Sequence, residues 1–338
     1  MARLKDIAEE LNLSISTVSR VVNNQDRVDP ETRRRVQEAI KRHHYQPDEN
    51  ARRLKLQTSN VIGVIVPDIA NPFYAQVIKG IERGVTDLRY TVLLCNTDEE
   101  ASREHEAIQL LSRQKVAGII VATSLHRKEI CRVYERLDCP VVFVDNVPSP
   151  QEGFYSVTID NRQAASDLVR YLISHGHQRI FLIGGPIGES SADEREEGWR
   201  QALKQSGIEP RPSWISHGDF QKESGYQIMR SFLSQSERPT AVLVTNNFMA
   251  FGAVEAIEEQ GLKIPDDLSI VTFDAQDTTG LMRLSLTSVV QPALDIGLIA
   301  ADLCLNTQKK RTSGLGRQVI LAHTFLPGDS VASQNIKI

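Results

Sequence analysis

The sequence predicts an α/β protein in three parts: a small three-helix head, a short polar connection and a large two-lobed body. In the head, short apolar stripes recur at helical spacing. In the body, which has about 280 residues, buried strand-like runs alternate with amphipathic helical segments. A body of that length buries a large core and usually divides into lobes.

The first two predicted helices of the head are separated by a tight turn. Apolar residues recur at helical spacing from Leu4 to Leu11, which predicts the first helix. Ser14 is a good N-cap for a second helix with a polar outer face that ends at Arg20. The apolar inner face of this second helix carries Val18, Val21 and Val22. Two short helices in this arrangement are typical of a helix-turn-helix.

A third helix and the distribution of charge complete the prediction for the head. Asp29 is a capping residue, and Pro30 suits the first position of a helix. Residues 1–58 contain twelve Lys and Arg against nine Asp and Glu, whereas the remaining residues contain 27 against 34. A positive head on an acidic body favours phosphate contact at one end of the chain. The helical pattern alone also fits a generic helical subdomain with a solvated polar face.

The body is predicted to contain two series of parallel strands, and hence two similar lobes with a cleft between them. The expected strands of the first series are Val61–Val66, Thr91–Cys95, Gly118–Ala122 and Val141–Asp145. Helices are expected over Pro72–Leu88, Ser102–Gln114 and His126–Leu137. The expected strands of the second series are Ser156–Ile159, Arg179–Gly184, Trp214–His217, Ala241–Thr245 and Leu268–Phe273.

A ligand site is expected beyond the carboxyl ends of these strands, where open parallel sheets bind their ligands. The residues there are mostly polar with some aromatic rings, and they fall in 68–74, 145–146, 185–195, 218–220, 246–247 and 274. Aromatic faces cover apolar C–H or π surfaces, and Asp, Asn and Arg hydrogen-bond hydroxyls. This composition favours a sugar-like or purine-like ligand.

Six short motifs occur in order along essentially the whole chain. They are Lys5-Asp6-Ile7-Ala8, Ser16-Thr17-Val18-Ser19-Arg20-Val21-Val22-Asn23, Pro30-Glu31-Thr32-Arg33, Asn71-Pro72-Phe73, Thr158-Ile159-Asp160-Asn161, and Gly176-His177 with Ile180. Together they resemble the LacI/GalR transcriptional regulators. That resemblance implies a helix-turn-helix DNA-binding domain over 1–46, a hinge helix or linker over 47–59, and an effector-binding and dimerisation domain over 60–338.

The resemblance also implies how the body is divided. Its fold would be that of periplasmic sugar-binding proteins, with an N-lobe of about 60–157 and 291–320 and a C-lobe of about 158–290 and 321–338. The chain would cross between the lobes three times, near 145–156, 289–292 and 320–325.

By the same resemblance, Ile15, Ser16 and Arg20 occupy base-reading positions. Arg usually pairs with guanine O6 and N7, and a good bidentate pair discriminates by roughly 1–3 kcal/mol. Ile15 is limited to apolar contact, for instance with a thymine methyl. The complete expected DNA-binding set is Leu4, Lys5, Ile15, Ser16, Thr17, Ser19, Arg20, Asn23, Arg27 and Leu54. Within it, Thr17, Ser19, Asn23 and Arg27 match backbone-contacting positions, although plain helix surface is the alternative for Thr17 and Ser19.

Leu54 matches the residue of the family's hinge that enters the minor groove of the operator. The hinge of this chain departs from the family at Asp48 and Glu49, since carboxylates suit a helix N-terminus but repel phosphates. A plain flexible linker is the alternative for this segment.

The residues that match effector-contacting positions of the family are Phe73, Tyr74, Ser191, Arg195, Phe220, Asn246 and Asp274. Arg195 holds its register with Gly198-Trp199. The alternative for Phe73 and Tyr74 is a place in the lobe core, and the alternative for Arg195 is an ion pair with Glu194 or Glu197.

The chain departs from the family pattern around this predicted pocket. Asn247 and Ala275 stand where Asp is common, and Asp193 stands where many relatives have Arg. With Glu189 and Glu194 nearby, the rim of the pocket is expected to be acidic. An acidic rim favours a neutral or hydroxyl-rich effector over a polyphosphate.

Several other functions are disfavoured by the sequence. Neither the four cysteines nor the histidine pairs have the spacing of a zinc site, and residues 184–188 lack the ending of a phosphate loop. No Gly-x-Ser-x-Gly elbow and no apolar run of about eighteen residues occurs. We therefore expect no enzyme activity, no cofactor and no membrane partner, and a cytoplasmic location.

The expected partners are a pseudo-palindromic double-stranded DNA operator, a small-molecule effector and a second copy of the chain in a homodimer. The alternative function is a cytoplasmic sugar-binding protein or enzyme whose basic head is only a tether.

Overall fold

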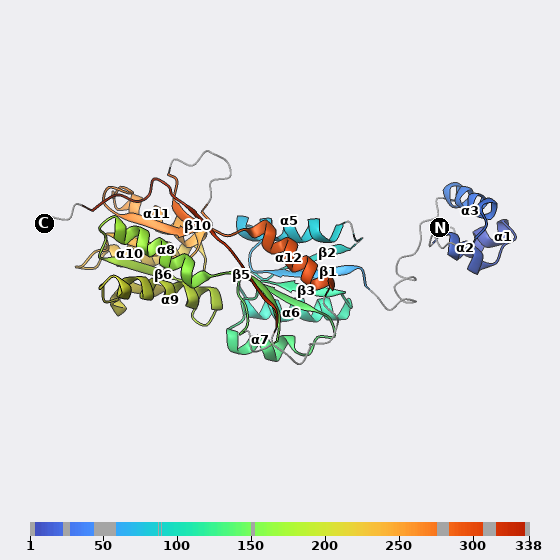
Figure 1. Cartoon of the computed structure of the whole chain (residues 1–338), viewed down its shortest axis with the longest axis horizontal. Helices are drawn as coiled ribbons and strands as arrows, with labels where there is room; N and C mark the ends of the chain where they lie inside the picture. The colour runs from blue at the N-terminus through green and yellow to red at the C-terminus, as the bar shows by residue number, and fades with distance from the viewer. Residues whose placement is uncertain are drawn as a thin grey trace. The chain divides into compact units, whose positions relative to one another are not determined.

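The structure is a computed structural model that describes residues 4–22, 28–43, 59–86, 88, 90–149, 153–275, 284–306 and 316–334. The chain divides into two compact units, with the boundary in the sequence between Ser59 and Asn60. The first unit is the head, and the second is the body; Figure 1 shows the elements of each.

Three helices make up the described part of the head: α1 (Leu4–Glu10), α2 (Ile15–Val22) and α3 (Pro30–Arg42). The Ser14 side chain accepts a hydrogen bond from the Thr17 amide over 3.1 Å, which caps α2 as the sequence predicted. The helices enclose a small core of Ile7, Ala8, Leu11, Val18, Val21, Val36 and Ala39. This core uses the apolar stripe of each helix and leaves the polar faces exposed.

The cap of α3 gives a first testable prediction. Asp29 Oδ1 accepts a hydrogen bond of 3.0 Å from the Thr32 amide, one of the donors that the helix itself leaves unpaired. Asp29→Ala is expected to lower the stability of α3 by about 0.5–2 kcal/mol. Hydrogen exchange of the α3 amides measures this loss, and Asp29→Ser, which keeps a capping oxygen, should restore most of the protection. Equal protection in the Ala and Ser variants would contradict the capping role.

The first lobe of the body is a six-stranded sheet between two layers of helices. Its strands are β1 (Val61–Val66), β2 (Thr91–Asn96), β3 (Gly118–Val121), β4 (Val141–Val144), β5 (Tyr155–Ile159) and β11 (Gln318–Leu321). They lie in the order β11-β5-β4-β3-β1-β2 and are parallel. Helices α5 (Pro72–Thr86) and α12 (Ala293–Asn306) cover one face, and α6 (Ala101–Arg113) and α7 (Arg127–Tyr134) cover the other (Figure 1).

The second lobe repeats this plan with the order β12-β10-β9-β8-β6-β7. Its strands are β6 (Ile180–Gly184), β7 (Ile215–His217), β8 (Ala241–Val244), β9 (Ser269–Phe273), β10 (Thr287–Val290) and β12 (Thr324–Leu326). Its helices are α8 (Asn161–Ser174), α9 (Ser190–Gln205), α10 (Lys222–Leu233) and α11 (Asn247–Glu259), with a short 3-10 turn at Pro212–Trp214. Only β12 runs antiparallel to its neighbour in this sheet.

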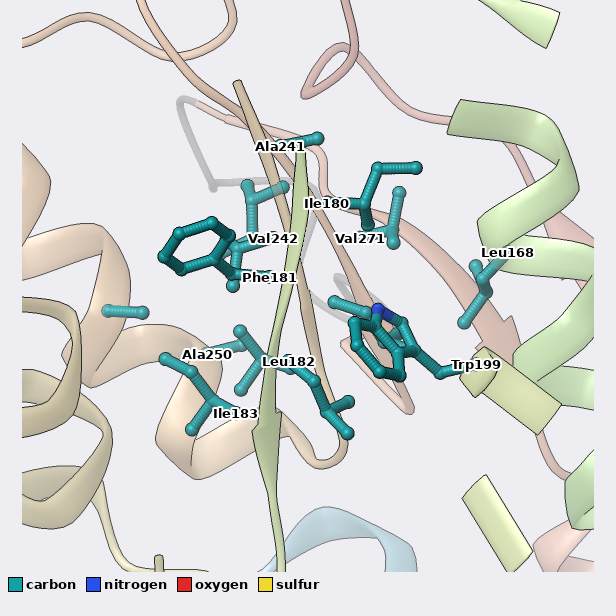
Figure 2. Close-up of a cluster of buried hydrophobic side chains, with 14 of the residues drawn as sticks. Leu168, Ile180, Phe181, Leu182, Ile183, Trp199, Ala241, Val242, Ala250 and Val271 are labelled. Atoms are coloured by element: carbon teal, nitrogen blue, oxygen red, sulfur yellow. The ribbon is translucent and has the colours of Figure 1, made fainter. Parts of the chain in front are cut away.

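Strand β6 shows why the sequence forms a sheet that is buried on both faces. Its residues alternate between the faces: Figure 2 shows Phe181 on the side of Ala250 from α11, and Leu182 on the side of Trp199 from α9. Both faces are apolar because helices cover both, so the strand reads as a continuous hydrophobic run.

The first crossing between the lobes was predicted too early in the chain. We expected the second series of strands to begin at Ser156, but β5 lies in the first sheet, between β4 and β11. The chain therefore leaves the first lobe after Ile159. The other crossings fall between β10 and α12 and between β11 and β12. A buried parallel strand has the same apolar pattern in either sheet, so periodicity alone does not assign it to a lobe.

Candidate nucleic-acid interface and ligand-binding cleft

The outer face of α2 is a polar surface with one apolar residue. Ile15 is 51% exposed, and Ser16 and Arg20 are also exposed. Helix geometry places residues 16 and 20 one turn apart, so Ser16 and Arg20 share a face. Val18 and Val21 pack inward and fix the orientation of this face. A short, exposed helix of this kind fits the major groove of DNA.

The remaining predicted DNA-binding residues have different surroundings. Leu4 is partly buried against the head core, and Lys5 forms an exposed ion pair of 3.4 Å with Glu9. Thr17 and Ser19 are partly buried, and the Thr17 hydroxyl lies 2.8 Å from Ser14 Oγ. Asn23, Arg27 and Leu54, like Asp48 and Glu49 of the predicted hinge, lie outside the described residues.

A cleft in the body opens where the strands of the two lobes end. About 440 Å³ of the cleft is not filled by protein atoms, and part of this space is open to solvent. The lining residues are Asp68, Asn71, Phe73, Tyr74, Glu99, Asp145, Arg195, Phe220, Gln221, Asn246, Asn247, Phe248, Asp274 and Gln291. Seven of these follow the carboxyl ends of seven different strands, where parallel sheets bind ligands: Asp68, Glu99, Asp145, Phe220, Asn246, Asp274 and Gln291.

Arg195 of α9 is the central cation of the cleft. The side chain is 4% exposed, its Nε donates to Asn161 Oδ1 over 2.8 Å, and its Nη1 donates to the Thr245 carbonyl over 2.6 Å. The guanidinium also stacks on the Phe273 ring, 4.1 Å from its centroid. Nη2 lies 3.7 Å from Asp145 Oδ1, and neither of these two atoms has a hydrogen-bond partner. A ligand hydroxyl can accept from the first atom and donate to the second.

Two carboxyl groups flank Arg195. Asp145 accepts a hydrogen bond of 2.9 Å from the Tyr74 hydroxyl on its Oδ2. Asp274 accepts from the backbone amide of Gln291 over 2.9 Å and from its Nε2 over 2.8 Å. Burial raises the pKa of Asp274, although the bonds from Gln291 act against this shift. The Gln291 Oε1 atom is buried and has no partner.

Four lining residues other than glycine have positive φ angles. They are Glu99 (60°), Asp145 (62°), Phe220 (64°) and Asp274 (53°). For residues with a side chain the left-handed region costs of order 1–2 kcal/mol, and such strain is concentrated at ligand sites. Each strained residue immediately follows a strand or lies within three residues of its end, so the strain directs side chains into the cleft.

A reciprocal pair of amides joins the two lobes at the cleft. Asn71 Nδ2 donates to Asn247 Oδ1 over 3.1 Å, and Asn247 Nδ2 donates to Asn71 Oδ1 over 3.0 Å. Asn71 precedes α5 of the first lobe, and Asn247 begins α11 of the second. Asn247 was expected beyond a strand end and was flagged as a departure from Asp. The structure gives a reason for the amide, since a carboxylate cannot donate the second bond.

Six of the seven predicted effector-binding residues line the cleft: Phe73, Tyr74, Arg195, Phe220, Asn246 and Asp274. Ser191 is buried in the first turn of α9 and is not among the lining residues. Phe73 and Tyr74 belong to the core of the first lobe as well, so the two readings of these rings are compatible. The alternative for Arg195 was an ion pair with Glu194 or Glu197. This alternative is wrong for Glu197, which pairs with Arg162 instead.

The acidity of the cleft has a different source from the one predicted. Glu189, Asp193 and Glu194 are not among the lining residues. Instead, four carboxyl groups that follow strands lie in the cleft: Asp68, Glu99, Asp145 and Asp274. Asp193 was expected at the rim because it stands where many relatives have Arg, but its carboxylate accepts a hydrogen bond of 3.0 Å from the Gly188 amide.

Glu99, Gln221, Phe248 and Gln291 were missed as candidate residues. Glu99 lies three residues beyond the end of β2, a strand whose edge position lets the chain turn back into the cleft. Burial raises the pKa of Glu99 to about 8, helped by the nearby charges of Asp145 and Asp68, while a hydrogen bond of 3.0 Å from Ser124 lowers it. A broader rule, that residues up to four positions past every expected strand are candidates, would have included Glu99, because that strand was expected to end at Cys95.

Other kinds of site receive no support from the described part of the chain. Its residues include no group of three or more His, Cys, Asp or Glu side chains placed to hold a metal ion. Every helix in the same residues is too short or too polar to span a bilayer.

The exposed recognition-type helix of the head and the polar interlobe cleft of the body define a ligand-responsive DNA-binding protein. Comparison with known proteins agrees. The profile of the bacterial regulatory proteins of the lacI family matches residues 3–48, and that of the periplasmic binding proteins and sugar binding domain of LacI family matches residues 59–326. The chain belongs to the LacI family; it is a transcriptional regulator and not an enzyme.

Relatives of known function are similar along almost their whole length. Catabolite control protein A of Priestia megaterium is 37% identical over 91% of this chain and 92% of its own. The transcriptional repressor CytR of Escherichia coli K12 is 34% identical over 98% and 97%. Among solved structures, the lac repressor dimer bound to operator and an anti-inducer matches with a TM-score of 0.85 and 28% identity, covering 98% of this chain and 99% of that one.

Proposed function

We propose that this regulator is a homodimeric repressor that binds a pseudo-palindromic operator and is released or held there by a small molecule bound in the cleft. The observation that carries the proposal is the set of buried, unpaired polar atoms in the cleft, which only a ligand or water can satisfy. The lac repressor structure, which contains a dimer on its operator, supports the same arrangement of partners.

The DNA side of the proposal assigns base contacts to α2. Arg20 and Ser16 would face base edges, Ile15 would make an apolar contact, and Leu4, Lys5, Thr17, Ser19, Asn23 and Arg27 would contact the backbone. The exposure of Ile15, Ser16 and Arg20 supports these roles. Residues 1–46 would form the DNA-binding domain and 47–59 the hinge, with Leu54 in the minor groove. One head reads few base pairs, so two heads on a dimer supply specificity.

The effector side assigns hydroxyl recognition to Arg195, Asp274 and Asn246, with Phe73, Tyr74 and Phe220 covering apolar faces and Ser191 supporting the first turn of α9. A ligand that fills the cleft would stabilise one closure angle of the lobes. Coupling of this type between two sites is typically 1–3 kcal/mol. Ordering each hinge residue costs on the order of 1–2 kcal/mol, so a small change in lobe closure is enough to decide whether hinges fold on DNA.

Arg20→Ala tests the DNA side. The variant is expected to lose operator preference because no other exposed side chain of α2 supplies a bidentate partner for guanine. Specific binding should weaken by about 10-fold or more, whereas binding to random DNA should change little. Fluorescence anisotropy with operator selected from a random library, at moderate salt, measures both affinities.

Lys41→Ala is a matched control, because Lys41 is an exposed cation on α3 rather than on α2. It should keep sequence preference. Equal affinity of the unchanged protein for selected and random DNA would overturn the proposal.

The alternative function is a sugar-binding protein whose basic head is only a tether. Removing residues 1–59 distinguishes it from the proposed regulator. The regulator loses DNA binding and keeps ligand binding, whereas the alternative requires full activity of the remaining body. Because the operator is chromosomal DNA, the proposal places the protein in the cytoplasm.

A further inference from the structure

The charge of the cleft is unbalanced. Four carboxyl groups, from Asp68, Glu99, Asp145 and Asp274, line it, and among the described lining residues Arg195 is the single cation. The Arg195 guanidinium already lies 3.7 Å from Asp145 and donates twice to the protein itself. Even with a proton on Glu99, the other three carboxyl groups outnumber this one guanidinium, so the cleft can accommodate a second positive charge.

The unpaired atoms of the cleft show what a ligand must offer. Gln291 is 4% exposed and its Oε1 has no partner, and Asp145 Oδ1 is also unpaired. These two atoms accept hydrogen bonds. Arg195 Nη2 is the unpaired donor among the lining residues. Two acceptors and one donor call for a ligand with donor groups and at least one acceptor, and a hydroxyl supplies both.

The aromatic residues of the cleft match a cation as well. Phe73, Tyr74, Phe220 and Phe248 line it, and Phe73 and Tyr74 pack edge to face with centroids 5.0 Å apart. Rings that present a face to a ligand attract an ammonium group by about 0.5–2 kcal/mol. Aromatic rings combined with carboxylates can therefore hold an ammonium group as well as the apolar face of a sugar.

We infer that the effector is a hydroxylated amine, such as an amino sugar or an amino alcohol, whose protonated nitrogen binds between Glu99, Asp68 and Asp145. This inference rests on the proposed function, because it names the ligand class of the same cleft. A phosphate or carboxylate ligand is disfavoured, since it would add negative charge beside the carboxyl groups of the cleft.

Titration of Glu99 makes the inference measurable. The groups that face it are Asp68, Asp145, Asp219 and Glu189, with Arg195 as the cation of the cleft. Because its pKa is raised to about 8, free protein holds a proton on Glu99 at neutral pH. An ammonium group favours the carboxylate and expels this proton. Its affinity should therefore rise with pH by up to about tenfold per unit below about pH 8 as long as the amine stays protonated, and should fall again at a pH where the amine loses its own proton.

The experiment uses the full chain and pairs of compounds that differ only in one group: glucosamine against glucose, galactosamine against galactose, and 2-amino-1,3-propanediol against glycerol, with glucose 6-phosphate as the anion. Calorimetry measures affinity for the unchanged protein, Glu99→Gln and Glu100→Gln. Glu100 is the exposed neighbour of Glu99 and is the matched control.

We expect the amine of at least one pair to bind about tenfold more tightly than its neutral partner. In Glu99→Gln that advantage should shrink and the rise of affinity with pH should disappear, whereas Glu100→Gln should retain both. If Glu99→Gln does not fold, Asp68→Asn is the second isosteric variant. It should also reduce the advantage of the amine over its neutral partner. Tighter binding of the neutral or anionic member, or no amine advantage in any pair, would overturn the inference.

Operator binding measured in parallel separates this outcome from failure of the proposed function. If the protein binds its operator but the cleft prefers neutral compounds, only the ligand class is wrong. If the protein shows no operator preference, the proposed function itself fails.

Discussion

Arg195→Met is expected to abolish the effector response while leaving operator affinity unchanged. The guanidinium makes two hydrogen bonds to the second lobe, stacks on Phe273 and offers its third nitrogen to the cleft. Methionine keeps much of the apolar contact but removes the charge that lies beside Asp145. Loss of one partner from a buried charged pair typically costs about 3–5 kcal/mol, so the thermal stability of the body should also fall.

Arg200→Met is the matched control for this variant. Arg200 lies five residues later on α9, and its ion pair with Glu196, 2.7 Å long, is partly exposed. Pairs of this kind contribute roughly 0–1 kcal/mol. Differential scanning calorimetry and operator anisotropy with and without ligand measure the two variants. A full effector response in Arg195→Met would refute the assignment of this residue to the cleft.

Gly297→Ala is expected to destabilise the first lobe by about 3 kcal/mol or more. A Cβ at this position would lie 2.1 Å from the Val77 carbonyl oxygen and 2.8 Å from the Ile81 nitrogen, both of them backbone atoms of α5. Gly80 of α5 has the reciprocal problem, because its Cβ would lie 2.2 Å from the Leu294 carbonyl oxygen. Alanine gains about 1 kcal/mol of helix propensity over glycine, but overpacking against fixed backbone outweighs that gain.

Urea unfolding of the full chain, followed by circular dichroism, measures the effect. Asp295→Ala is the control, because Asp295 is exposed two residues earlier on α12 and should change stability by less than about 1 kcal/mol. An unchanged urea midpoint for Gly297→Ala would contradict the prediction. It would mean that α5 and α12 can move apart to admit the Cβ with no loss of unfolding free energy.

The sequence predicted most of the body because buried parallel strands and amphipathic helices leave separate, regular patterns. The expected run Val61–Val66 is β1 in the structure, and Ser14 caps α2 as expected. The short strands at 318–321 and 324–326 were not predicted. They are partly exposed edge strands, and their pairing with β5 and β10 depends on contacts far away in the chain.

The cleft was predicted in part for a similar reason. Position at a strand end is local information, and together with the family resemblance it led to Arg195, Asn246 and Asp274. The missing element was the pairing of side chains across lobes, as in Asn71 with Asn247, which are 176 residues apart. The left-handed backbone at Glu99 was also invisible, because a glutamate gives no local signal for positive φ.

The amide pair between Asn71 and Asn247 has a consequence for how this switch works in solution. Both partners are uncharged, so neither ionic strength nor protonation changes this contact directly, and the charged contact between the lobes, Arg195 with Asp145, is buried where salt screens it little. The affinity of a protein for DNA, by contrast, falls steeply as the salt concentration rises. Raising the salt concentration should therefore weaken DNA binding and leave the contact between the lobes unchanged. The two processes can then be measured separately in one sample by varying the salt.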